Sequence, residues 1–107
     1  MATTVHDNAE RSRYEIEVDG TPAGFAEYRL TGGRLAVTHT EIDPAFGGQG
    51  LGTRLIESVV RSAQDAGLAV LPYCWFVRDF IAAHPEHLAL VPPEDRAQFR
   101  LPADPAG

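Results

Sequence analysis

The sequence predicts a compact α/β (α+β) fold, in which an antiparallel strand meander precedes a glycine-rich loop, an amphipathic helix, a parallel strand and a short C-terminal helix. Three observations predict it. Residues 13–42 contain extended segments between short turns, residues 44–53 are crowded with glycine, and residues 51–66 carry apolar side chains at helical spacing. A chain of 107 residues has the length of one domain. The strand, loop, helix, strand order implies a parallel crossover.

Composition and charge exclude several classes of protein. The chain has 9 Lys and Arg residues against 15 Asp and Glu residues, a net charge of −6, whereas a nucleic-acid-binding surface needs an excess of positive charge. The single Cys cannot form an internal disulfide, and the start of the chain lacks the apolar core of a signal peptide, so we expect a cytoplasmic protein. No apolar run approaches the roughly 18 residues of a membrane span, so we expect no membrane partner.

The first half of the chain predicts three strands. Residues 13–18 alternate apolar and polar side chains with the period of a half-buried strand. The dipeptide Asp19-Gly20 separates them from a second extended segment, residues 23–30. Gly32-Gly33 tolerates the positive φ angles of a tight hairpin and leads into a third strand, residues 34–42. Sequential strands joined by short turns pair with one another, so we expect an antiparallel meander.

A loop and an amphipathic helix follow. Residues 44–53 contain four of the ten glycines, too many for a strand or a helix interior. Beyond them, apolar side chains recur every three or four residues until Gly67 stops the helix. The apolar positions are Leu51, Leu55, Ile56, Val59, Val60, Ala63 and Ala66.

The remaining chain predicts one more strand and one more helix. Residues 68–73 form a short apolar run, typical of a buried strand beside residues 34–42. Residues 75–83 show helical spacing, and Pro85 ends this helix because it disfavours helical geometry at His84. Aromatic side chains at helical spacing usually belong to a core, so we expect burial of Trp75, Phe76 and Phe80.

These elements predict a single domain over residues 13–91. Residues 1–12 show no periodicity, which predicts a flexible leader. Residues 92–107 hold four of the eight prolines and little periodicity, which predicts a loosely held tail.

The glycine-rich loop is a candidate anion site. Where such a loop joins a strand to a helix N-terminus, several backbone N–H groups point to one spot, and the helix dipole adds about half a positive charge. The loop lacks the Gly-Lys-Ser or Gly-Lys-Thr of a nucleotide P-loop, and the chain has no second β-α-β half for a dinucleotide. Two interpretations remain: a pyrophosphate bound without a metal, or a flexible connector whose glycines only turn the chain.

Residues 47–52, Gly-Gly-Gln-Gly-Leu-Gly, resemble the acetyl-coenzyme A pyrophosphate loop of the GCN5-related N-acetyltransferases. The chain is more closely similar to the small, minimal branch of that superfamily, which joins a His-Thr-Glu strand end to such a loop and later carries Cys-x-Phe-Val and His-Pro-Glu. Here these landmarks are residues 39–41, 74–77 and 84–86, in that order. Gly47 stands where the larger superfamily has Arg or Gln, which removes one side-chain contact to the coenzyme.

The resemblance implies acetyl-coenzyme A as a co-substrate and no metal. Pantetheine would run between the strands at residues 34–42 and 68–73, which splay apart in this superfamily and leave strand groups free for its amides. The expected walls are Ile42 on one side and residues 71–73, followed by Cys74, on the other. The pyrophosphate would meet the loop and the first helical turn at Gly47, Gly48, Gln49, Gly50, Gly52 and Thr53.

Acetyl transfer to an amine needs a base for the amine proton, donors for the thioester oxygen and an acid for the leaving thiolate. His39 and Glu41 are two residues apart and so share a strand face. His39 is the favoured base because histidine titrates near neutrality, and Glu41 either is a second candidate or binds the acceptor. Cys74 precedes a helix, which favours the reactive thiolate, so it either takes the acetyl group transiently or lines the thioester pocket. Tyr73 is a candidate acid near the sulfur.

Each of these residues also has an ordinary structural interpretation. His39 could be a hydrogen-bonded imidazole at the sheet edge and Glu41 a solvated surface glutamate. Cys74 could be a small buried thiol and Tyr73 a packing residue.

His84 and His87 have a spacing that could suggest zinc. Pro85 breaks the helix that would align them and no third ligand is evident, so we expect no metal site.

The resemblance therefore implies an N-acetyltransferase that moves acetyl from acetyl-CoA to a primary amine, either a small amine or a protein lysine or N-terminus. The negative net charge favours a cationic acceptor. A second hypothesis is a non-catalytic coenzyme A or acyl-CoA binding module. A thiol-transfer protein is a third, disfavoured because the chain has no second Cys.

Overall fold

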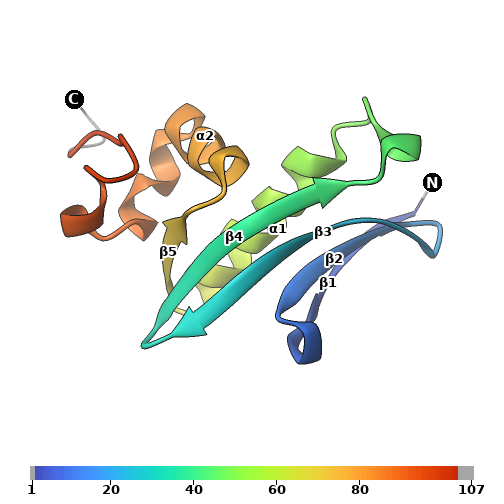
Figure 1. Cartoon of the computed structure of the whole chain (residues 1–107), viewed down its shortest axis with the longest axis horizontal. Helices are drawn as coiled ribbons and strands as arrows, with labels where there is room; N and C mark the ends of the chain where they lie inside the picture. Colours follow the sequence, from blue (N-terminus) through green and yellow to red (C-terminus); the bar gives the residue numbers. More distant parts are fainter. Residues whose placement is uncertain (1, 104–107) are drawn as a thin grey trace.

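Five strands form one mixed sheet in the computed structural model, which describes residues 2–103 (Figure 1). β1 (Thr3–Asn8), β2 (Arg13–Val18), β3 (Thr21–Thr31) and β4 (Arg34–Ile42) pair antiparallel in chain order. β5 (Ala69–Pro72) adds to the edge of β4 in parallel. The predicted meander, the parallel crossover and the α+β fold class are therefore confirmed.

Two predicted turns set the register of the hairpins. Asp19 and Gly20, between β2 and β3, have φ angles of 51° and 82°. Gly32 and Gly33, between β3 and β4, have φ angles of 58° and 77°. Consecutive positive φ angles are typical of type I′ turns, whose twist matches that of paired strands.

A bulge in β4 decides which side chains this strand presents to each face. Thr38 is the extra residue, because its two neighbours pair with consecutive residues of β3. An extra residue shifts the alternation of side chains by one position. Thr40 therefore joins the buried Val37 on the helix-covered face, whereas His39 and Glu41 project from the opposite face.

Helix α1 (Leu51–Asp65) packs its apolar stripe across one face of the sheet and lies behind it in Figure 1. The helix ends in a Schellman motif: the Leu68 N–H donates to the Ala63 carbonyl at 2.9 Å, and the Gly67 N–H donates to the Gln64 carbonyl at 3.1 Å. Gly67 has a φ of 70°, so the predicted stop is confirmed. The buried side chains are Leu51, Leu55, Ile56, Val59, Val60 and Ala63.

Helix α2 (Trp75–Ala83) has the predicted bounds, and its buried side chains are Val77, Phe80 and Ile81. Phe76 packs partly buried against the core. Trp75 is 71% exposed, so the prediction that it belongs to the core is wrong. At about 100° per residue, Trp75 lies roughly 200° around the helix from Val77 and so faces away from the buried side. No helix within residues 2–103 combines the length and the apolar character needed to cross a membrane.

The prediction of a flexible leader at residues 1–12 is wrong over most of that segment. β1 pairs with β2 along its whole length, from Thr3 opposite Val18 to Asn8 opposite Arg13. A 3-10 turn, η1 (Ala9–Arg11), then leads into β2. Backbone hydrogen bonds to β2 hold this edge strand in place. Its sequence therefore lacks the strong apolar alternation from which a strand is predicted.

The prediction of a loose tail at residues 92–107 is also wrong as far as residue 103. After η3 (Pro85–Leu90) and η4 (Pro93–Asp95), the chain buries Phe99 and Leu101 in the core. The buried Arg96 side chain donates to the carbonyls of Val91 at 2.9 Å and Ala103 at 2.7 Å. These anchors are irregularly spaced, so no periodicity predicted them. Residues 104–107 lie outside the described part of the chain.

Candidate functional site

The loop before α1 presents an unpaired row of backbone donors. After η2 (Pro44–Phe46), Gly48 and Gly50 adopt φ angles of 80° and 71°, which side chains with a Cβ rarely adopt. None of the amides of residues 48–53 donates a hydrogen bond within the described chain, and the first bond of α1 runs from the Arg54 N–H to the Gly50 carbonyl. Unpaired N–H groups at the positive end of a helix suit an anion. The Gln49 side chain and the Thr53 hydroxyl are exposed beside them.

Two of the loop glycines have structural roles. The Gly47 N–H donates to the Pro44 carbonyl at 3.1 Å, so the free backbone donors begin at Gly48. A Cβ on Gly52 would lie 2.9 Å from Cζ of Phe76, so this glycine lets α2 approach the first turn of α1. The loop glycines thus serve two purposes: they leave backbone N–H groups free, and they allow α1 and α2 to pack closely.

The two parallel strands separate beside this loop. β5 pairs with β4 only as far as Val37 opposite Pro72, while β4 continues through residues 38–42 without a partner on that side. The Cys74 N–H donates to the Val37 carbonyl at 2.9 Å, and no bond joins the strands beyond it in the described chain. Because β5 ends at Pro72, β4 keeps a free edge beyond it, where the resemblance places pantetheine. An extended, amide-bearing ligand can pair on such a strand edge.

The Cys74 thiol lies at the end of this split, on the helix-covered side of the sheet. Its side chain is 7% exposed, and Sγ lies 3.4 Å from Oγ1 of Thr40. Cys74 is also the N-cap residue of α2 and makes no side-chain capping bond. Sequence reasoning did not single out Thr40. Alternation alone places it opposite His39 and Glu41, but its contact with Cys74 depends on where β5 meets β4.

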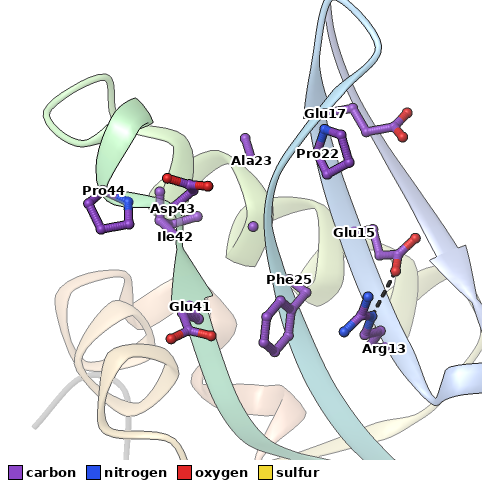
Figure 2. Close-up of a pocket in the computed structure, with 11 residues that line it drawn as sticks. Arg13, Glu15, Glu17, Pro22, Ala23, Phe25, Glu41, Ile42, Asp43 and Pro44 are labelled. Carbon is purple, nitrogen blue, oxygen red and sulfur yellow. Dashed lines mark hydrogen bonds and ion pairs between the residues drawn. The ribbon is translucent and has the colours of Figure 1, made fainter.

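His39 and Glu41 share a face, as predicted, and both are exposed. Neither side chain makes a hydrogen bond or an ion pair with another described residue. The His39 ring lies 5.9 Å from the Phe25 ring, and Glu41 lines a pocket together with Phe25 and the half-buried Ile42 (Figure 2). The structure therefore places the imidazole and the carboxylate on one face of the sheet and the Cys74 thiol on the other.

Tyr73 lies between β5 and Cys74 and is 56% exposed. Its ring packs edge-on against Phe99 of the C-terminal segment, with centroids 5.1 Å apart. This contact agrees with the packing interpretation.

The two histidines with zinc-like spacing pack instead against α2. Nδ1 of His84 donates to the Phe80 carbonyl at 2.8 Å, and the imidazoles of His84 and His87 stack on the Phe80 ring. Across residues 2–103, no group of three or more His, Cys, Asp and Glu side chains is arranged to hold a metal ion.

Comparisons with known proteins agree with this fold. Three solved structures share the fold. A GCN5-like protein from Staphylococcus aureus matches 83% of this chain and 87% of its own length, at 19% identity and a TM-score of 0.64. The ribosomal-protein-S18-alanine N-acetyltransferase of Escherichia coli has 24% identity and a TM-score of 0.52, over 54% of this chain and 38% of its own. Ard1 of Thermoplasma volcanium has 18% identity and a TM-score of 0.51, over 60% of this chain and 44% of its own.

The present chain thus spans less than half the length of the Escherichia coli and Thermoplasma proteins. None of the curated proteins gives a significant match. A family model described as GCN5-related N-acetyltransferase matches residues 13–91, a range that includes the loop, the split between β4 and β5, and Cys74. With most of its length covered by that model, the chain belongs to the GCN5-related N-acetyltransferase family.

Proposed function

We propose that the protein transfers an acetyl group from acetyl-CoA to a primary amine, with the pyrophosphate on residues 48–53 and pantetheine along the free edge of β4. The row of backbone amides without partners at the start of α1 carries the proposal. It lies at the loop end of β4, where the chain leaves the strand edge that β5 does not cover.

The residues present fit a coenzyme with a pyrophosphate. Cβ positions built on Gly48 and Gly50 have no atom within 4 Å, so the space over the loop is open. Arg54 is exposed in the first turn of α1 and adds a positive charge near the free amides. An anion there would gain charge-assisted hydrogen bonds without displacing any internal bond of the loop.

Bound acetyl-CoA would supply an acetyl group already activated as a thioester. The chain's own task is to remove a proton from the incoming amine, because a protonated amine has no lone pair with which to attack. The His39 imidazole is exposed and has no hydrogen-bond partner in the described chain, so it is free to accept that proton directly or through water. Glu41, on the same face, can hold the amine while the proton moves.

For Cys74 we favour a role in lining the site over a covalent role. A nucleophilic thiol needs a base that takes its proton. The one side-chain hydrogen bond of the Cys74 thiol in the described chain is with the Thr40 hydroxyl, while His39 and Glu41 project from the other face of the sheet. This arrangement supports direct transfer from the coenzyme to the amine.

The substitution His39→Gln tests the proposal, with acetyl transfer from acetyl-CoA to a lysine-containing peptide followed by mass spectrometry. We expect kcat to fall about a hundredfold, in the usual range for loss of a general base, and the acidic limb of the pH profile to disappear. His6→Gln is the matched control, because His6 is an exposed histidine on the outer edge strand β1.

Unchanged kcat in His39→Gln would remove the base assignment. Tight acetyl-CoA binding without transfer to any amine would favour the non-catalytic coenzyme-binding module instead.

A further inference from the structure

The face of the sheet opposite α1 is uncovered, and we call it the open face. Outward side chains of β2, β3 and β4 form it in two cross-strand rows, set by the register of the strands. One row runs from Glu15 through Phe25 to Glu41, and the other runs from Arg13 through Glu27 to His39. Helices α1 and α2 contact the sheet from the other side, where the core lies. The open face therefore presents the candidate base to solvent.

A pocket of about 400 Å³ lies on the open face, close to where β4 ends. Figure 2 shows its Phe25 ring between Glu41 on β4 and the Arg13–Glu15 pair on β2. Glu17 and Asp43 complete its acidic rim. A bulge in β3, at the residue before Gly24, bends the strand under the pocket.

The charges in this pocket are unbalanced. Arg13 is its one cation among the described lining residues, and it is engaged: Nε donates to Oε2 of Glu15 at 2.7 Å, and the guanidinium lies 4.7 Å from the Phe25 ring centroid. Glu17 and Glu41 have no hydrogen-bond or ionic partner in the described chain. Within the described chain, the Asp43 carboxylate accepts only the Ala45 N–H, at 2.9 Å. Three carboxylates are thus left without a counter-ion.

The basic side chains on the same face lie toward its other end. By register, Arg29 and Arg34 project from the open face near the β3–β4 turn, and Arg34 faces Glu94 at 3.9 Å. The open face is therefore acidic at the end of β4 where the coenzyme loop begins and basic at the opposite end. A cationic partner meets favourable charge only at the acidic end.

We infer that this pocket docks a basic segment of a partner protein and presents one of its lysines to His39. This inference rests on the proposed function for the identity of the acceptor, but not for the docking itself. Glu17 and Glu41 come from strands on either side of β3, and Glu17 lies two residues beyond Glu15, the residue in register with Glu41. Two strand spacings and two residues along the strand place their backbones about 12 Å apart. A segment with two basic side chains can meet both carboxylates, whereas a monoamine can meet only one.

The composition of the chain makes the inference directly measurable. All nine of its basic residues are arginines, so the protein carries no lysine of its own. Any acetyl-lysine formed in a reaction must therefore belong to the partner.

The test measures binding of a fluorescein-labelled peptide of alternating Lys and Ser to the full chain by anisotropy, without acetyl-CoA. We expect the double substitution Glu17→Gln, Glu41→Gln to weaken binding about tenfold at low salt, because each exposed ion pair contributes modestly and the two add. The control, Glu57→Gln with Asp65→Asn, changes the charge equally on the exposed side of α1 and should weaken binding less than twofold. Glu17→Gln alone, expected to give about a threefold loss, serves if the double variant does not fold.

Equal weakening by both double variants would overturn the inference, and so would displacement of the peptide by an equal concentration of spermidine, which would point to a small polyamine. Acetyl-CoA binding, measured separately by calorimetry, keeps the two proposals apart. If the coenzyme binds while the substitutions at Glu17 and Glu41 leave peptide affinity unchanged, the docking inference fails and the proposed function stands. If the coenzyme does not bind while peptide affinity follows these carboxylates, the docking surface stands and the proposed function fails.

Discussion

The Cys74 thiol and the His39 imidazole project from opposite faces of the sheet, and the thiol lies 3.4 Å from the Thr40 hydroxyl. Because no base contacts the thiol, we predict that Cys74→Ala retains acetyl transfer with kcat reduced less than about tenfold, the loss of a wall rather than of a nucleophile. Steady-state kinetics with a purified lysine peptide measure this. A loss above a thousandfold, together with an acetyl group found on Cys74 of the wild-type protein by mass spectrometry, would establish the covalent route.

The ionised carboxylate of Glu15, on the open face, contributes to the free energy of unfolding. The Arg13 guanidinium that donates to its carboxylate holds the pKa of Glu15 below its ordinary value, and hydrogen bonds from Asn8 and His6 act in the same direction. A carboxyl group with a lowered folded-state pKa stabilises the fold above its unfolded pKa, and this contribution disappears as the pH falls through the folded-state value.

We therefore predict that Glu15→Gln lowers the free energy of unfolding by about 1 kcal/mol at pH 7, the usual scale of a partly buried charged hydrogen bond. Near pH 2.5 the wild type and the variant should converge. Urea denaturation at both pH values measures the difference. A deficit of equal size at both would show that the side chain contributes through packing.

At the scale of single residues, the sequence predicted what depends on local periodicity. His39 and Glu41 share a face because strands alternate with period two. The contact between Thr40 and Cys74 joins residues 34 positions apart, and the bulge at Thr38 leaves no mark on composition. Neither could be predicted without the register of the strands.

At the scale of elements, the loop before α1 is held open by backbone conformation. Gly48 has a φ of 80° and Gly33, in the β3–β4 turn, has a φ of 77°, and an added Cβ would meet no atom within 4 Å at either. Substituting either by Ala should therefore cost about 1–2 kcal/mol of stability through backbone strain alone.

Only Gly48→Ala should also weaken acetyl-CoA binding, by about tenfold, because the strained loop relaxes and turns its amides away from a common point. Calorimetric titration of both variants measures this, with Gly33→Ala as the control for strain. Equal coenzyme affinity in the two variants would show that the loop conformation does not determine binding.

Elements with a strong local signal were predicted with nearly their observed bounds. The bounds of α2, β2 and β4 match, and α1 ends at its glycine because the Schellman motif needs a positive φ there. β1 was missed because backbone pairing to β2, a tertiary contact, holds it in place. The burial of Trp75 was wrongly predicted. Helical spacing gives the period of an apolar stripe, but it does not fix which residues of the first turn belong to that stripe.

At the scale of the whole molecule, the sheet separates two candidate binding surfaces. The split between β4 and β5 and the loop amides lie where the sheet meets its helices, whereas the acidic pocket and His39 lie on the open face. β4 borders both, so a ligand along its free edge and a partner on the open face would meet at this strand. The sequence predicted the loop as an anion site from its glycines, but the acidic pocket draws on three strands and could not be predicted from any one segment.

Backbone amide spectra of the isotope-labelled protein during titration with acetyl-CoA test the central claim most directly. We predict the largest chemical-shift changes at the amides of residues 48–53, with further changes along residues 38–42 of β4. If the amides of residues 48–53 are protected from hydrogen exchange in the free protein, or if they stay unmoved while signals elsewhere shift, the coenzyme does not bind at this loop and the assignment is wrong.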